Sequence, residues 1–267
     1  MYKLIDTHCH LDLSVFNPDR LEILRRCQQK NIHQIVVPAI KRSNWDTMLE
    51  VCHKHNQLVP ALGLHPYFIE DHSLSDLDDL RQYIQTSNAI AIGEIGLDYY
   101  RKDLDLEKQL TFFEAQLAIA EQFKLPVIMH IRKAHDLAIL TLKKYKLNGG
   151  IVHAYSGNFE QAKYYIAMDF KLGFGGMLTF ERSRKLHQLA EKLPLESIVL
   201  ETDAPDMTVA SHQGERNSPE YLDECLQALA RIKNLPLETI AQHTTDNAYM
   251  ALPKLAEHTR RNSNNPV

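Results

Sequence analysis

Short apolar runs rich in β-branched residues recur roughly every 30 residues along the chain. Within each run almost every position is hydrophobic, which is typical of parallel strands that are covered on both faces. We therefore predict eight such strands. They span residues 3–7, 33–38, 58–62, 89–93, 126–130, 150–153, 171–175 and 197–201.

Between these runs lie longer stretches in which apolar residues recur at helical spacing. Leu21, Leu24 and Cys27 share one face of the stretch that follows the first run. The stretch after the second run opens with Ser43, a residue type that commonly caps helices. The predicted helices span residues 19–30, 43–55, 104–123, 134–145, 159–168, 183–193, 219–233 and 237–252.

Eight strands that alternate with helices predict an α/β fold of the TIM (β/α)8-barrel type. We expect residues 1–252 to form a single catalytic barrel domain and residues 253–267 a polar C-terminal tail. An open doubly wound sheet is the alternative. It is disfavoured because no G-x-G-x-x-G motif follows the first strand. In a TIM barrel the active site lies at the C-terminal ends of the strands, so the residues there are the candidate site residues.

The composition narrows the class of protein. The 267 residues carry a net charge of -4, so a polyanionic substrate would be attracted locally rather than by a basic surface. Four widely spaced cysteines without a CxxC pair indicate reduced thiols and a cytoplasmic protein. No apolar run reaches the ~18 residues of a membrane span, and nothing at the start resembles a signal peptide. We predict neither a membrane nor an obligate protein partner.

The first run ends in a pair of histidines. His8 and His10 are two residues apart in an extended segment, so their rings point the same way and can grip one metal ion. Cys9, between them, then faces the layer between strands and helices. His130 and His153 end two consecutive later runs, and would project into the same cavity as the first pair.

Carboxylates follow the fourth and the eighth run. Burying Glu94 unpaired would be costly, and its two oxygens could bridge two cations or pair with an arginine inside the barrel. Asp203 could bind a metal and accept a proton from an attacking water. Glu201, two residues earlier, could hydrogen-bond a ligand histidine. Ligands from strands one, four, five, six and eight fit a closed barrel better than an open sheet.

Other residues of the predicted loops at this end could contact a substrate. His65 could contact a phosphate or stabilise a His-Pro turn. Arg132 and Tyr155 belong to a set of cations and aromatics that suits a single-stranded nucleic-acid end, and equally suits solvated loops and core packing. The remaining histidines, such as His72, are expected at the surface.

The motifs around these residues resemble the TatD family of metal-dependent hydrolases, the TatD-type deoxyribonucleases, and most of all its YjjV-like branch. The resemblance covers residues 1–252, nearly the whole chain. The motifs are His8-x-His10, GLHP at 63–66, GEIGLD at 93–98, PVIMH at 126–130, HAYSG at 153–157 and ETDAP at 201–205.

The resemblance implies a TIM barrel that holds two divalent cations and hydrolyses phosphodiester bonds of DNA, as a 3′→5′ exonuclease, with metal-activated water. It implies that His8, His10 and Glu94 hold one cation. Glu94, His130 and His153 would hold the second, and Asp203 would complete the site and orient the water. Glu94 and Asp203 are thus the expected catalytic residues. Because imidazole and carboxylate ligands are mixed, Mg²⁺, Mn²⁺ and Zn²⁺ all remain candidates.

Two other functions stay open at this point. The same ligands would serve a two-metal hydrolase of a non-nucleic-acid ester, lactone or amide. A non-catalytic metal or nucleotide sensor on the same barrel is the second alternative, although the intact Glu94 and Asp203 argue against it.

Overall fold

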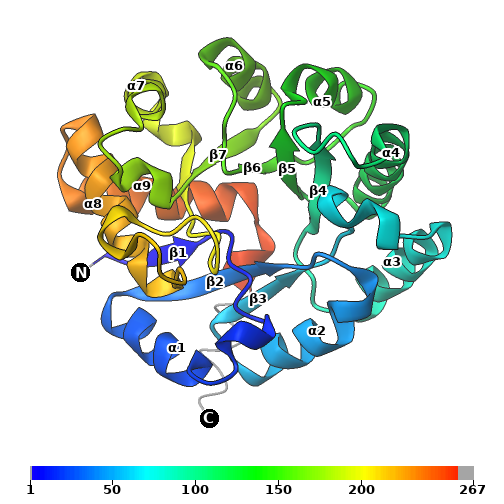
Figure 1. Cartoon of the computed structure of the whole chain (residues 1–267), viewed down its shortest axis with the longest axis horizontal. Helices are drawn as coiled ribbons and strands as arrows, with labels where there is room; N and C mark the ends of the chain where they lie inside the picture. The colour runs from blue at the N-terminus through cyan, green and yellow to red at the C-terminus, as the bar shows by residue number, and fades with distance from the viewer. Residues whose placement is uncertain (1, 258–267) are drawn as a thin grey trace.

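Eight parallel strands lie inside a ring of helices in the computed structural model, which describes residues 2–257 (Figure 1). The predicted TIM-barrel fold is confirmed. The strands are β1 (Leu4–Asp6), β2 (Ile32–Pro38), β3 (Leu58–Ala61), β4 (Ile92–Asp98), β5 (Val127–Arg132), β6 (Gly150–His153), β7 (Phe170–Phe174) and β8 (Ile198–Leu200). The longer helices are α1 (Arg20–Gln29), α2 (Trp45–Lys54), α3 (Leu74–Thr86), α4 (Leu106–Phe123), α5 (His135–Leu142), α6 (Phe159–Ala167), α7 (Arg184–Lys192), α8 (Leu222–Lys233) and α9 (Leu237–Ala251). Within residues 2–257, none of the helices combines the length and apolar character needed to cross a membrane.

The barrel wall consists of two ladders, β1-β2-β3 and β4-β5-β6-β7-β8, joined at two seams. At the β3/β4 seam a single bridge pairs Leu62 with Ile92. At the β8/β1 seam the Thr7 amide donates to the Leu200 carbonyl over 3.1 Å. The Asp6 carboxylate reinforces this second seam by accepting a 2.6 Å hydrogen bond from the Thr202 hydroxyl.

Strand alternation places the predicted ligands above an apolar floor inside the barrel. Ile128, Ile151 and Val199 point inward and belong to one buried cluster. Two residues further along each strand, on the same face, come His130, His153 and Glu201. The alternate residues face outward and pack against the helices in the second, larger cluster. Each ligand therefore stands one pleat above a hydrophobic residue of its own strand.

Helix α9 and the residues after it close the bottom of this floor. Ala248, Leu252 and Leu255 belong to the inner apolar cluster. Leu255 is buried although it lies within the predicted polar tail, and the Gln34 side chain donates to its carbonyl over 3.1 Å. Residues 258–267 of that predicted tail lie outside the described part of the chain.

Leu255→Ala is expected to lower the free energy of unfolding by about 2–5 kcal/mol, the range for a leucine removed from a closed core. The measurement is the urea midpoint, followed by circular dichroism. Leu21→Ala is the matched control because Leu21 is 61% exposed, and it should change stability by no more than about 0.5 kcal/mol. Equal effects of the two substitutions would contradict the packing described for Leu255.

Two elements differ from the sequence prediction. Strand β4 continues to Asp98 instead of ending at residue 93, so Glu94 lies within the strand rather than after it. Its pairing with β5 shifts between Ile92 and Ile95. Helix α3 was not predicted because little of it is apolar and buried. Its sequence signal is a capping box, in which the Ser73 amide donates to the Asp76 carboxylate over 2.9 Å.

Candidate metal centre

The six predicted ligands meet at the mouth of the barrel. Five of them line a pocket of about 630 Å³, and the sixth, His8, is fully buried beneath it. Three overlapping groups of side chains at this place could hold a metal ion. The groups are His8, His10 and Glu94; His65, Glu94 and His130; and His8, His153 and Glu201.

In the first group, histidines from the end of β1 face one oxygen of Glu94. Glu94 Oε2 lies 3.1 Å from His8 Nε2 and 3.6 Å from His10 Nε2. The Nδ1 atom of His10 is 3.1 Å from the Pro38 carbonyl, which directs Nε2 toward the centre. Ligands held at about 2.1 Å by a common cation are about 3.0–3.4 Å apart, so the 3.1 Å spacing suits an ion and the 3.6 Å spacing lies just above this range.

In the second group, the other oxygen of Glu94 faces histidines from the ends of β3 and β5. Glu94 Oε1 lies 3.0 Å from His65 Nε2 and 3.2 Å from His130 Nδ1. The distance to His153 Nε2 is longer, 3.9 Å. His65, expected to contact a phosphate, thus lies closer to Glu94 than one of the expected ligands. Because each Glu94 oxygen faces its own pair of imidazoles, the carboxylate sits between two potential cation positions.

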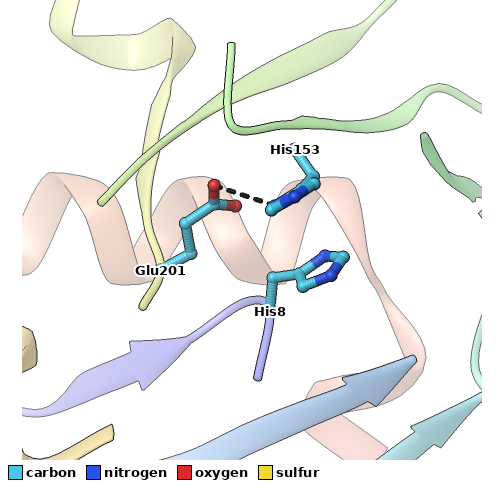
Figure 2. Close-up of side chains that lie close together, drawn as sticks. All are labelled: His8, His153 and Glu201. Carbon is cyan, nitrogen blue, oxygen red and sulfur yellow. Dashed lines mark ion pairs between the residues drawn. The ribbon is translucent and has the colours of Figure 1, made fainter. Parts of the chain in front are cut away.

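The third group joins β6 and β8 (Figure 2). The Glu201 carboxylate points at the His153 ring, with Oε1 3.0 Å from Nδ1, and the His8 and His153 rings are stacked at 3.6 Å. Glu201 Oε1 also accepts a 2.6 Å hydrogen bond from the Ala154 amide. Glu201 therefore fixes the orientation of His153 and leaves His153 Nε2 directed toward Asp203, 3.7 Å away.

Asp98, which was not among the predicted site residues, contacts the side of the His130 ring that faces away from Glu94. Its Oδ2 atom lies 3.1 Å from His130 Nε2, and its Oδ1 atom accepts the Tyr100 amide over 3.0 Å. This contact leaves His130 Nδ1 free to face Glu94. A signal was present in the GEIGLD motif, since Glu94 and Asp98 are four residues apart and share one face of a strand.

Asp98→Asn is expected to weaken the binding of Mn²⁺ or Zn²⁺ by about 10–100-fold, the usual cost of losing the partner of a ligand histidine. Isothermal titration of the metal-free protein would measure this. Asp103→Asn, on the following exposed loop, is the control and should bind as the wild type does. Unchanged affinity in Asp98→Asn would show that His130 needs no such support.

Burial and neighbouring charges shift the pKa values of these groups in opposite directions. Burial lowers the pKa of His10 to about 4 and raises the pKa of Asp203 to about 7. Burial alone would lower the pKa of His153, but the carboxylates of Glu201 and Asp203 raise it to about 10. Burial would raise the pKa of Glu94, yet His65 and His8 hold it well below its usual range. Negative charge is therefore concentrated on a buried carboxylate between the imidazoles.

Several buried polar atoms of the centre have no hydrogen-bond partner among residues 2–257. They include both ring nitrogens of His8 and the Oε2 atoms of Glu94 and Glu201, because the 3.1 Å approach of His8 Nε2 to Glu94 Oε2 lacks the alignment of a hydrogen bond. Buried polar atoms almost always find a partner, so such a concentration needs an explanation. A cation would supply the missing interaction, and imidazole with carboxylate is a common donor set for divalent metals. The residues thus fit the expected ions.

The remaining predicted contacts divide into those at the pocket and those away from it. Arg132 lines the pocket at the end of β5. Tyr155 does not, and its prediction as a substrate contact is corrected. Its ring packs against His135, and its hydroxyl donates to the Asn158 carbonyl over 2.7 Å. The expectation for His72 was also wrong, because it is buried with Nε2 3.0 Å from the His65 carbonyl. Tertiary packing, which the sequence pattern does not reveal, determines that Tyr155 and His72 are both buried.

Comparison with known proteins gives consistent matches. The profile of the family described as TatD related DNase matches residues 5–253. A protein of Escherichia coli K12, the uncharacterized metal-dependent hydrolase YjjV, is 38% identical over 250 residues, which cover 92% of this chain and 96% of the relative. An uncharacterized metal-dependent hydrolase of Haemophilus influenzae is 40% identical over 253 residues, covering 91% of this chain and 97% of the relative.

Solved structures show the same fold. The crystal structure of YjjV, a TatD homologue from Escherichia coli K12, has a TM-score of 0.90 and 37% identity, covering 94% of this chain and 98% of that one. A TatD-family hydrolase from Entamoeba histolytica has a TM-score of 0.80 at 22% identity, covering 94% of this chain and 99% of that one. The second likeness concerns the fold alone.

Proposed function

The chain belongs to the TatD-related DNase family of metal-dependent hydrolases, and from this premise we propose that it hydrolyses phosphodiester bonds of DNA as a 3′→5′ exonuclease with two divalent cations. The observation that carries the proposal is the placement of Glu94, whose two oxygens face separate groups of imidazoles. A carboxylate buried to 1% exposure in this position needs positive charge on both sides.

The donor set supports two ions of Mg²⁺, Mn²⁺ or Zn²⁺. Glu94, Asp98, Glu201 and Asp203 bring four carboxylates to one region, and two divalent cations carry the opposite formal charge. We assign His8, His10 and Glu94 to one cation and Glu94, His130 and His153 to the other, with Asp203 completing the site. Bound there, the cations would activate water and neutralise charge on the phosphate as the bond breaks.

Separate residues of the protein would accept the proton, orient a metal ligand and attract the phosphate. Asp203 is more exposed than Glu94, at 16% against 1%, and lines the pocket, where its carboxylate can accept the proton of an attacking water. Glu201 fixes the orientation of His153, and Arg132 lies at the rim, where its charge can attract the phosphate backbone. We propose that residues 1–252 act together as one catalytic domain without an obligate partner. The four free, buried thiols fit a reducing compartment such as the cytoplasm.

A short single-stranded DNA labelled at its 5′ end tests the activity. Stepwise shortening that requires added Mg²⁺, Mn²⁺ or Zn²⁺ and stops with chelator is the expected result. A lactone and a dipeptide, tested in parallel, separate this activity from hydrolysis of another bond. Metal-dependent cleavage of either, without loss of the oligonucleotide, would replace the nuclease proposal with that alternative.

A further inference from the structure

The cations around the barrel mouth differ in whether a carboxylate pairs with them. On the flank beside Tyr67, the Lys41 ammonium lies 2.8 Å from Asp71. The Arg101 guanidinium, which also contacts the Tyr67 hydroxyl, lies 2.5 Å from the Asp103 carboxylate. Carboxylates thus neutralise Lys41 and Arg101, whereas Lys102, next to Arg101 on the same loop, has no carboxylate partner among the described residues.

On the neighbouring side of the mouth, Arg132 ends β5 and Lys133 follows it, and neither forms an ion pair with any carboxylate of residues 2–257. The Arg132 guanidinium lies 3.8 Å from the centroid of the Tyr100 ring. Both side chains are exposed, Tyr100 to 55%, so the stacked pair presents an open flat surface. A cation stacked on an aromatic ring beside a second free cation suits a base with its phosphate.

A groove leads from the metal pocket past this pair. The groove has a volume of about 650 Å³, and Arg132 and Ser156 line both it and the pocket. A second groove of about 550 Å³ continues from Ser156 toward α7 and adds Lys185 and Lys192, which also lack a carboxylate partner among the described residues. The two grooves share Ser156, Gly157 and Asn158 of the loop before α6, and Figure 1 shows α5, α6 and α7 next to one another around this part of the barrel.

The loop shared by the two grooves, residues 156–158, is fixed by hydrogen bonds within its own segment of the chain. The Tyr155 hydroxyl donates to the Asn158 carbonyl, and Asn158 and Gln161 exchange two 2.9 Å hydrogen bonds at the start of α6. The carboxylate that lines the first groove, Asp136, accepts a 2.7 Å hydrogen bond from Gln161. A fixed loop reduces the entropy lost when a flexible strand binds.

We propose that the single-stranded DNA flanking the scissile phosphodiester binds along these two grooves, with a base stacked at Tyr100 and Arg132 and the following phosphates beside Lys133, Lys185 and Lys192. The inference rests on the proposed nuclease function and adds the route of the substrate. With a net charge of -4, the protein must attract DNA locally, and four cations without an ion pair, Arg132, Lys133, Lys185 and Lys192, line these two grooves.

Binding without turnover tests the route. Fluorescence anisotropy of a labelled single-stranded DNA with phosphorothioate linkages, which resist hydrolysis, would compare the metal-loaded full-length wild type with Tyr100→Ala, Arg132→Ala and Lys133→Ala. We expect Tyr100→Ala and Arg132→Ala each to weaken binding about tenfold, in the range for a lost stacking contact. Lys133→Ala should reduce the slope of log affinity against log salt by about 0.7. Lys102→Ala removes the same charge from the neighbouring exposed loop and should change affinity less than about twofold.

Rates on two substrates distinguish a role of Tyr100 in DNA binding from a role in bond cleavage. For Tyr100→Ala, the ratio of kcat/KM on the oligonucleotide to kcat/KM on bis-p-nitrophenyl phosphate, which has no flanking nucleotide, should fall about tenfold. An equal loss on both substrates would place Tyr100 in the catalytic pocket and overturn the route, as would affinities in all three variants that match Lys102→Ala. DNA binding that these variants weaken, without turnover in the wild type, would keep the route and overturn the nuclease function.

Discussion

Glu94→Gln is expected to remove at least one bound cation and to lower kcat/KM by about 10³-fold. The carboxylate is buried, and its oxygens lie 3.1 Å from His8 Nε2 and 3.0 Å from His65 Nε2. A glutamine of the same size keeps one oxygen but turns an NH₂ group toward the other histidine, so it cannot bridge two ions. Loss of charge stabilisation worth several kcal/mol corresponds to a rate effect of this size.

Metal content from plasma mass spectrometry, together with steady-state rates on the oligonucleotide, would test this expectation. Glu50→Gln is the matched control, because Glu50 is an exposed residue of α2 that pairs only with Lys54, 2.6 Å away among the described residues. It should keep full metal content and full activity. Two ions retained in Glu94→Gln would show that the carboxylate is not the bridge.

Asp203→Asn is expected to lower kcat by about 10²–10⁴-fold while KM changes little, the signature of a lost general base. The Asp203 oxygens lie 3.7 Å from the nearest nitrogens of His8, His10 and His153, further than the Glu94 oxygens lie from His8 Nε2 and His65 Nε2, at 3.1 and 3.0 Å. The residue thus borders the histidines on one side and the open pocket on the other. We expect metal binding to survive the substitution in part and proton transfer to fail.

The backbone at Asp203 calls for a specific control. Its φ of 57° lies in the left-handed region, which asparagine tolerates as readily as aspartate does. Asp169 has a φ of 63° and is exposed between α6 and β7, so Asp169→Asn makes the same exchange in the same conformation away from the centre. That variant should retain its rate. A kcat in Asp203→Asn close to that of Asp169→Asn would refute the assigned role.

The strands were largely predictable because buried parallel strands leave a continuous apolar signature. The same regularity brought six dispersed side chains to one predicted end of the barrel. The prediction failed at β4, where the register with β5 shifts between Ile92 and Ile95 and the strand continues to Asp98. Two glycines in that segment weaken its apolar signal, so its end appeared too early and Asp98 was missed.

Side-chain direction after a strand end was harder to predict. Alternation holds only while the chain stays extended, and both His65 and Tyr155 follow their strands by two or more residues. His65 turns inward to Glu94, whereas Tyr155 turns outward into the aromatic layer around His135. Which way each turns depends on contacts with helices distant in the sequence. Helix α3 was missed for a related reason, since Leu77 and Leu80 are its only fully buried side chains in the described structure.

The two ladders that meet at the seams contribute different kinds of side chain to the metal centre. The ladder of β1 to β3 delivers only imidazoles, His8, His10 and His65, whereas all four carboxylates come with the ladder of β4 to β8. Imidazoles alone favour softer ions such as Zn²⁺, and carboxylates favour Mg²⁺ or Mn²⁺. The ion preference of the finished site therefore belongs to neither half of the chain. It arises only where the two sheets meet and close the barrel.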